Sequence, residues 1–404
     1  MSIIKTISAK EIKDSRGKPT IEVTVETDDG FFSASVPSGK STGKNEALEL
    51  RDEDGKGVSK AIEHVNTVLN TALQGKDCRE QRALDELMIE LDGTENKSKL
   101  GANTILGVSM ALTRAGSFAK KIPLYAYIAE LSGYELKSSS LPYPMFNIIN
   151  GGAHAENELA IQEFMVVPQR DSFAENVTLG SKIFQNLTEL VKEKFGAVPQ
   201  LGDEGGYAPM ISSAQEALGM LKSAMGEEQH VNISLDCAAS EFFQDGLYTI
   251  DGKELSRAEL VEFYKDLVTR FNIITIEDPF SEEDWEGFQA IHAALPEATI
   301  IGDDLTTTNI KKIKEAQEKN ACNGVLIKLN QIGSVSETID AINLTKSYGW
   351  KVAVSHRSGE TMDDFIADLA AGTGADFLKS GSPAKEERMV KYKRLLDIEK
   401  ELKE

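Results

Sequence analysis

The sequence predicts an α/β protein in which a C-terminal βα barrel of the TIM type follows an N-terminal α+β domain. In the second half of the chain, six short apolar runs each stop at a charged residue or a histidine. The runs are rich in Val and Ile, which is typical of buried parallel strands. In the first half, strand-like alternation gives way to helical periods, the order expected of an α+β domain.

We expect residues 1–133 to form the N-terminal domain, as a lid or cap for the second domain. Apolar and polar residues alternate within residues 1–30, and Asp28-Asp29-Gly30 is typical of a hairpin turn before a second strand at 31–36. From about residue 57 to residue 131 the apolar spacing becomes helical.

Residues 134–404 are expected to form the barrel, after a boundary segment at 132–144 that contains Gly, Pro and several Ser residues. The expected strands lie at 231–235, 273–276, 299–302, 324–327, 351–355 and 375–378. Helical patterns alternate with them at 214–225, 257–270, 310–319, 335–347 and 363–371. Right-handed crossovers would close these units into a barrel.

The residue that follows each strand is charged or a histidine, and we expect these residues to converge. Parallel strands bring their C-terminal ends to one face, and the chemistry of a βα barrel takes place at that face. The residues that should share one pocket are Asp236, Glu277, Asp303, Lys328, His356 and Lys379.

Asp236, Glu277 and Asp303 indicate a metal site. Each acid alone has an ordinary explanation, since an Asp at the end of a strand often caps the following helix. Three carboxylates on three successive strands favour a hard divalent cation such as Mg²⁺, which takes oxygen ligands. No His or Cys accompanies them, which argues against zinc.

Two lysines and one arginine are expected beside these acids. Lys328 and Lys379 either pair with the acids or, near a metal and another cation, have a lowered pKa that lets a lysine act as a base. The turn that follows the strand at 351–355 contains Arg357 and Ser358. A capped helix start would use similar residues, but Arg together with hydroxyls and amides favours an anion site for phosphate or carboxylate.

Three loops complete the pattern. Residues 202–206 form either a tight turn or a loop whose backbone approaches a ligand closely. Residues 151–155 form a similar loop around His154. Residues 34–41 come close to a phosphate-binding P-loop, but Ala34 stands where Gly is needed and Pro37 removes an amide. We therefore expect a mobile lid there and not a nucleotide site.

The composition excludes several classes of function. A net charge of −21 argues against nucleic acid or an anionic membrane as the main partner. The chain has neither a signal-peptide core at its start nor an apolar stretch long enough to span a membrane, so we expect a cytoplasmic protein. The three cysteines are widely spaced, which excludes a disulfide framework and fits a reducing compartment.

These motifs together resemble the enolase family, over nearly the whole chain. The segments concerned are DSRG at 14–17, STG at 41–43, EALELRD at 46–52, KSKLGANTIL at 97–106, NGGAH at 150–154, QEF at 162–164, GDEGG at 202–206, LDC at 235–237, IEDPF at 276–280, DDLTTTN at 303–309, KLNQIG at 328–333, SHRSGET at 355–361 and GSPA at 381–384. Their joint order leaves little room for chance. A related barrel enzyme that acts on sugar acids would carry a Lys-x-Lys motif, whereas Asn330 stands two residues after Lys328.

The resemblance implies an enolase-type barrel that catalyses a glycolytic reaction, the reversible, Mg²⁺-dependent dehydration of 2-phosphoglycerate to phosphoenolpyruvate. It implies two Mg²⁺ per active site. Asp236, Glu277 and Asp303 would hold the first, and the backbone of Ser41 would hold the second together with the substrate phosphate. A homodimer or a larger homo-oligomer is also implied.

The resemblance further implies a role for each side chain. Lys328 would take the proton from carbon 2, and Glu204, with Glu163 beside it, would protonate the departing 3-hydroxyl. Lys379 would pair with the substrate carboxylate. The other residues implied at the site are His356 in the catalytic set, and Ser41, His154, Gln162, Arg357 and Ser358 in contact with the substrate.

Overall fold

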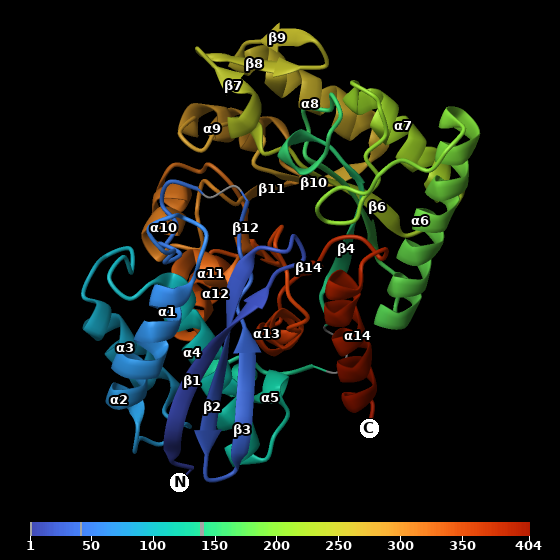
Figure 1. The fold of residues 1–404 in the computed structure, drawn as a ribbon. Coiled ribbons are helices and arrows are strands. Elements are labelled where there is room, and N and C mark those ends of the chain that lie inside the picture. Colours follow the sequence, from blue (N-terminus) through green and yellow to red (C-terminus); the bar gives the residue numbers. More distant parts are fainter. Residues whose placement is uncertain (1, 41–42, 138–140) are drawn as a thin grey trace.

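The computed structural model describes residues 2–40, 43–137 and 141–404 (Figure 1). Its N-terminal part is an antiparallel sheet in the order β1-β2-β3, followed in the chain by helices, which confirms the α+β pattern. The elements are β1 (Ile4–Lys13), β2 (Pro19–Thr27), β3 (Gly30–Ser35), α1 (Ser59–His64), the π-helical turn η1 (Val65–Leu69), α2 (Asn70–Leu73), α3 (Gln81–Asp92), α4 (Ala102–Lys120) and α5 (Leu124–Ser132).

The first hairpin forms where the sequence predicts it. Thr27 pairs with Gly30, so that Asp28 and Asp29 make the turn between β2 and β3. Helix α4 packs closely on this sheet because it has a glycine at the contact. A Cβ atom on Gly107 would lie 2.6 Å from Cγ2 of Val23.

Among the described residues of the C-terminal part, eight strands close into a barrel in the order β10-β11-β12-β13-β14-β4-β5-β6. They are β4 (Tyr143–Asn150), β5 (Glu163–Pro168), β6 (Val231–Asp236), β10 (Ile273–Glu277), β11 (Thr299–Gly302), β12 (Gly324–Ile327), β13 (Lys351–Ser355) and β14 (Phe377–Lys379). The six strands expected from the sequence are β6 and β10 to β14, and they run parallel to one another.

Strands β4 and β5 were not predicted, and β5 runs antiparallel to both of its neighbours. The chain between Asn150 and Glu163 contains only the short 3-10 helix η2 (Gly152–His154), not the full helix that a parallel crossover needs. Because β5 is reversed, its first residue lies at the face where the other strands end. Glu163 pairs with both Asn150 and Asp236.

The helices that surround the barrel agree with the sequence at most positions. They are α6 (Phe173–Phe195), α7 (Ala214–Met225), α8 (Arg257–Phe271), α9 (Trp285–Ala294), α10 (Ile310–Glu318), α11 (Leu329–Ile332), α12 (Val335–Ser347), α13 (Phe365–Thr373) and α14 (Glu386–Glu401). The long interval between Asp236 and Glu277 contains the 3-10 helix η3 (Ala239–Phe242) and an added small sheet of β7 (Phe243–Gln244), β8 (Leu247–Ile250) and β9 (Lys253–Leu255).

The expected domain boundary falls between two elements. Helix α5 ends at Ser132 and strand β4 begins at Tyr143. The division into residues 1–133 and 134–404, with the first as a lid or cap, stays a prediction. Within the described ranges, no helix combines the length and the apolar character that crossing a membrane requires.

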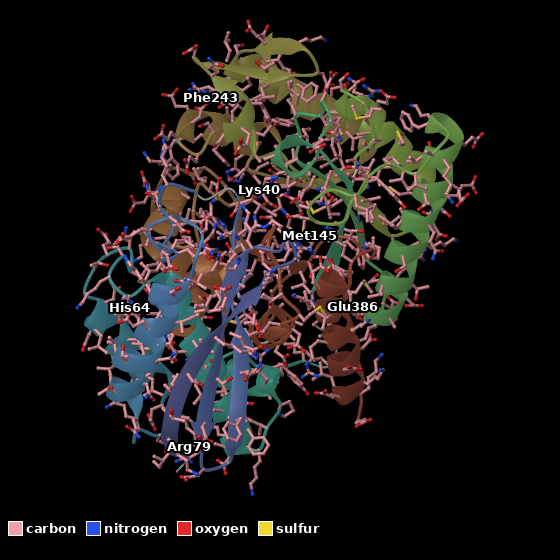
Figure 2. The ribbon with its side chains drawn as sticks, in the orientation of Figure 1. Lys40, His64, Arg79, Met145, Phe243 and Glu386 are labelled. Carbon is pink, nitrogen blue, oxygen red and sulfur yellow. The ribbon has the colours of Figure 1, made fainter. Side chains whose placement is uncertain are left out.

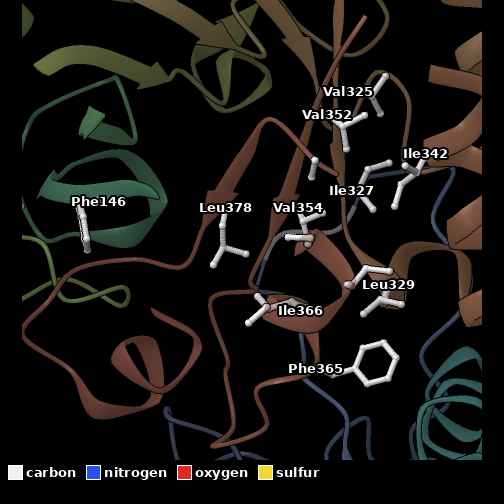
Figure 3. Packing of buried hydrophobic residues seen from close by; sticks show 14 of the residues in the cluster. Phe146, Val325, Ile327, Leu329, Ile342, Val352, Val354, Phe365, Ile366 and Leu378 are labelled. Atoms are coloured by element: carbon white, nitrogen blue, oxygen red, sulfur yellow. The ribbon is translucent and has the colours of Figure 1, made fainter. Parts of the chain in front are cut away.

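The period of two along each barrel strand positions the charged residues. On β14, Phe377 belongs to the apolar group inside the barrel, and Leu378 faces outward toward Ile366 of α13 (Figure 3). Lys379 therefore points inward again, above the apolar group. That group consists of Met145, Met165, Val167, Ile301, Leu326, Ala353 and Phe377.

Side chains join the two parts of the chain. Lys40, labelled near the centre of Figure 2, donates from Nζ to the carbonyl of Ala153 at 2.7 Å. Arg114 of α4 donates to both carboxylate oxygens of Asp363, at 2.7 and 2.8 Å. Burial opposes the ionisation of Asp363, but the guanidinium outweighs it and holds the pKa of this carboxyl below its ordinary value.

Asp363→Asn should therefore destabilise the protein at pH 7, on the order of 3 kcal/mol, because Arg114 loses a buried partner. A carboxyl with a depressed pKa stabilises the fold above its unfolded pKa and loses this effect as the pH falls through its folded pKa. The difference between the two proteins should shrink below about pH 4, as measured by urea unfolding across pH.

The control is Asp340→Asn, which breaks a pair of the same kind between Arg82 and Asp340. Those side chains are 49% and 42% exposed, against 19% and 9% for Arg114 and Asp363. Asp340→Asn should lower the free energy of unfolding by less than about 1 kcal/mol. Equal losses in the two variants would contradict the proposed importance of the buried pair.

Candidate active site

The strand ends surround a cavity of about 250 Å³ at the C-terminal face of the barrel. The residues singled out in the sequence that line it are His154, Gln162, Glu163, Glu204, Asp236, Asp303, Lys328, His356, Arg357, Ser358 and Lys379. Glu277 is fully buried next to Lys379, and Ser41 lies outside the described residues. The fold thus brings the expected residues together, while their individual roles stay predictions.

Lys379 lies among three buried carboxylates. Its Nζ is 2.8 Å from Asp236 Oδ2, 2.7 Å from Glu277 Oε2 and 3.2 Å from Glu163 Oε1. The pairing of β5, β6 and β10 produces this group, because Asp236 is in register with both Glu163 and Glu277. Gln162 donates from Nε2 to Asp236 Oδ2 at 3.3 Å.

Burial and charge act against each other in this group. Burial, with the charge of Asp236 added, raises the pKa of Glu277 well above its ordinary value. Burial also opposes the charge on Lys379, but Asp236 and the two glutamates outweigh it and raise the pKa of this lysine. Lys379 is therefore a permanent cation at neutral pH.

Lys328 has the same kind of environment on the other side of the cavity. Its Nζ forms a short ion pair with Asp303 Oδ2, while Gln331 Nε2 donates to Asp303 Oδ1 at 2.9 Å. Burial opposes the charge on Lys328, but Asp303 together with Glu277 and Asp304 outweighs it and raises the pKa of the lysine. Both lysines pair with carboxylates, which was one of the two expectations. The other, a pKa lowered beside a bound metal, depends on a cation at these acids and stays a prediction.

The predicted metal ligands offer hard oxygen donors, as Mg²⁺ requires. Glu277 Oε1 is buried and has no hydrogen-bond partner among the described residues, so it has an unused lone pair for a cation. The ligand atoms of Asp236, Glu277 and Asp303 do not all lie within 4.8 Å of one another, whereas those of Asp278, Asp303 and Asp304 do. Asp278 accepts the backbone amides of Asp303 and Asp304, at 2.9 and 2.8 Å, which gives it a structural function in this loop.

Glu163 and Glu204 form a buried pair with two histidines. His356 Nε2 lies 3.3 Å from Glu204 Oε2, and His154 Nδ1 lies 3.5 Å from Glu204 Oε1. Asn147 Nδ2 donates to Glu204 Oε2 at 3.0 Å. The ligand atoms of His154, Glu163 and Glu204 lie within 4.8 Å of one another.

The two glutamates differ in pKa. Burial, with the charge of Glu204 added, raises the pKa of Glu163 well above its ordinary value. Burial opposes ionisation of Glu204 as well, but its neighbours His356 and His154 outweigh burial and hold the pKa of Glu204 well below its ordinary value. The two pKa values are therefore pushed apart, so that Glu163 holds a proton more readily than Glu204.

The strand order separates this pair from Lys328. In the closed sequence of eight strands, β5 with Glu163 is four strands from β12, after which Lys328 follows. Strands four apart in a ring of eight lie on opposite walls. The cavity therefore has a lysine on one wall and a pair of glutamates on the other.

The third wall contains Arg357 and Ser358, which follow β13. Arg357 donates from Nη1 to Glu46 Oε2 at 3.0 Å and to Asn330 Oδ1 at 2.9 Å. Ser358 Oγ accepts from Arg16 Nη1 at 3.2 Å. Because Glu46 and Arg16 belong to the N-terminal part, both parts of the chain form this wall.

The loop at 202–206 contains the tight turn that was one of the two expectations, with the Gly205 N–H donating to the carbonyl of Gly202 at 3.1 Å. A Cβ on Gly202 would lie 2.7 Å from Oδ1 of Asn150, and a Cβ on Gly206 would lie 2.8 Å from the same atom. Gly205 has φ +86°, which favours glycine. The close approach is therefore to the protein itself, and it holds Glu204 in place.

Several residues at the site were not singled out from the sequence. Glu46 and Gln331 occur in the segments that resemble enolases, but no role was assigned to them. Asn147 is a polar residue inside the apolar strand β4, and this interruption is a signal that sequence analysis can use. Arg388 contacts His356 from helix α14, and no local pattern distinguishes it from a solvated arginine.

Comparisons with known proteins agree with this geometry. The family model described as "Enolase, N-terminal domain" matches residues 4–128, and that described as "Enolase, C-terminal TIM barrel domain" matches residues 138–404. The enolase of Eimeria tenella is 49% identical, over 100% of this chain and 96% of that protein. The enolases of Methanosarcina barkeri and Methanosarcina mazei are 48% and 49% identical, each over 99% of this chain and 95% of its own length. The chain therefore belongs to the enolase family.

Proposed function

We propose that the cavity at the barrel mouth performs the enolase reaction with each of its charged residues in a separate role. As a member of the family, the protein is an Mg²⁺-dependent lyase that interconverts 2-phosphoglycerate and phosphoenolpyruvate in glycolysis. The observation that supports these roles best is the position of Lys328 and the Glu163–Glu204 pair on opposite walls of one cavity.

Asp236, Glu277 and Asp303 are proposed to hold one Mg²⁺ through carboxylate oxygens. When bound, the cation offsets the negative charge that develops on the substrate carboxylate as the neighbouring proton leaves. A second Mg²⁺, with the backbone of Ser41 and the substrate phosphate among its ligands, is part of the same proposal. Lys379 pairs with the substrate carboxylate and adds a fixed positive charge.

The proton transfers follow from the two walls. Lys328, in its neutral form, removes the proton from carbon 2 of 2-phosphoglycerate, because Asp303 no longer stabilises the ammonium once its charge is shared with the bound cation. The Glu163–Glu204 pair delivers a proton through Glu204 to the 3-hydroxyl, which leaves as water. The reaction balances in protons, since one proton is taken from carbon 2 and one is given to the departing oxygen.

The remaining residues bind and orient the substrate. Arg357 presents two N–H groups to the phosphate and Ser358 presents a hydroxyl, a geometry that a guanidinium fork suits. His154 and Gln162 contact the substrate from the side of the carboxyl pair, and His356 belongs to the catalytic set beside Glu204. A cytoplasmic location and a homodimer or larger homo-oligomer stay predictions.

Removal of divalent metal should abolish dehydration, and added Mg²⁺ should restore it. Glu277→Gln should weaken Mn²⁺ binding, measured by electron paramagnetic resonance, by more than the roughly 10–100-fold that loss of an outer-shell partner costs. Glu283→Gln, which changes an exposed glutamate, is the control. Full activity in a protein shown to be free of metal would refute the metal assignment.

Arg357→Lys should weaken binding of phosphate-bearing inhibitors about 10–100-fold, although the charge is kept. The lysine loses one charge-assisted hydrogen bond, worth about 1.5–3 kcal/mol. An inhibitor without the phosphate should bind both proteins alike in calorimetry. Unchanged affinity for the phosphate-bearing compound would show that Arg357 does not contact that group.

The two half-reactions should separate by mutation. Proton removal needs Lys328 but does not need the hydroxyl to leave. Glu204→Gln should therefore lose dehydration, by roughly 10²–10⁴-fold, yet still exchange the carbon-2 proton of 2-phosphoglycerate with deuterium. Lys328→Ala should lose both activities.

The measurement is NMR of substrate recovered from heavy water. If exchange survived in Lys328→Ala and vanished in Glu204→Gln, the assigned roles would be reversed. The Glu204 variant keeps the shape of the side chain, so a loss of activity with an unchanged circular dichroism spectrum reports on chemistry.

A further inference from the structure

Arg388 is a fully buried arginine whose hydrogen bonds all go to uncharged groups. It lies on α14 and donates from Nη1 to His356 Nδ1 at 2.7 Å and to the carbonyl of Arg357 at 2.6 Å. From Nη2 it donates to the carbonyls of Ser358 and Asp203, at 2.7 and 3.2 Å. Among the described residues, the one carboxylate within 4 Å is that of Glu387, 3.9 Å from Nε.

These contacts determine the protonation of His356. A guanidinium has only donors, so Nδ1 of His356 has to accept with its lone pair. The imidazole proton must then be on Nε2, the nitrogen that lies 3.3 Å from Glu204 Oε2. Protonation of Nδ1 would direct one N–H group against another.

The other groups around His356 do not reverse this result. Glu204, from the loop at 202–206, favours a positive imidazole, whereas Arg388 and Lys379, from α14 and β14, oppose it. Burial is the largest effect, and with Arg388 it lowers the pKa of His356 to about 4. The imidazole is therefore neutral throughout the physiological pH range.

The same guanidinium connects two loops of the site. Its acceptors Arg357 and Ser358 belong to the proposed phosphate loop, and Asp203 precedes Glu204. One side chain thus sets the distance between the proposed phosphate-binding residues and the proposed acid. Arg388 itself does not line the cavity.

We infer that Arg388 is a positioning residue for the reaction: it holds His356 as the neutral Nε2–H tautomer, so that this histidine presents an N–H group on the side of Glu204 and does not act as an acid. The inference rests on the proposed function of Glu204. His356 is therefore an uncharged hydrogen-bonding group among the charged residues of the site.

The direct test is ¹⁵N NMR of the intact protein with labelled histidine, which reports the protonation of each ring nitrogen. In the unchanged protein, His356 should show Nε2–H from pH 5.5 to pH 8.5. In Arg388→Met, Nδ1 loses its donor and the imidazole loses a neighbouring positive charge. The Nδ1–H form should then appear, and His356 should titrate within this range.

Activity provides the second readout. Arg388→Met should lower kcat about 100-fold, as expected for a misplaced catalytic group, and should add an ionisation to the pH profile of kcat. Arg388→Lys keeps one donor, so its kcat should lie between those of the unchanged protein and Arg388→Met. Millimolar guanidinium chloride should restore part of the activity of Arg388→Ala, whereas sodium chloride should not.

The control is Arg394→Met on the same helix. Arg394 donates to both carboxylate oxygens of Asp368 at 2.9 Å and does not contact His356. This variant should lose thermal stability but keep the tautomer and the pH profile.

An Nδ1–H tautomer in the unchanged, active protein would overturn the inference, even if every Arg388 variant failed to fold. The inference would also be overturned if the Arg388 variants lost only thermal stability, as is expected of Arg394→Met. If the proposed function is wrong, the deuterium-exchange experiment shows it. The ¹⁵N NMR measurement of the His356 tautomer does not depend on that result.

Discussion

Lys379 and the three carboxylates around it are the constraint on which the site depends. Asp236, Glu277 and Glu163 end or begin three adjacent strands, so the barrel register forces them together. Like charges in a buried space cannot all remain ionised without a cation. Lys379 provides one positive charge, and the raised pKa of Glu277 shows that this does not fully compensate the three acids. A divalent cation is the natural complement, which links the Mg²⁺ dependence of the family to strand pairing.

The apolar group below this layer explains why the charges stay at the mouth. Met165, Leu326 and Phe377 fill the interior of the barrel beneath Glu163, Lys328 and Lys379. Because side chains alternate along a strand, each of these apolar residues lies two positions from its charged partner, on the same side. The inward face of the strands thus carries apolar side chains at the centre of the barrel and charged side chains at its C-terminal end.

Sequence analysis identified this layer where a charge directly follows an apolar run, as in Asp236, Glu277, Asp303, Lys328 and Lys379. It missed β5 as a strand because that strand is reversed and its functional residue precedes the apolar run. Gln162 and Glu163 were therefore expected only through the resemblance to enolases. Whether the two lysines pair with the acids or act as bases was left open, since the choice depends on contacts such as that between Lys328 and Asp303. Arg388 was missed because a buried arginine and a solvated one look alike in a helical sequence.

The N-terminal part explains how an acidic protein can present cations to an anionic substrate. Arg357 is already bonded to Glu46, just as Lys379 is bonded to Asp236 and Glu277. A buried cation without such a partner would destabilise the fold. The proposed roles imply that Arg357 exchanges the carboxylate of Glu46 for the substrate phosphate, and that Lys379 exchanges a protein carboxylate for that of the substrate. Because Glu46 belongs to the N-terminal part, these roles would couple substrate binding to the contact between the two parts of the chain.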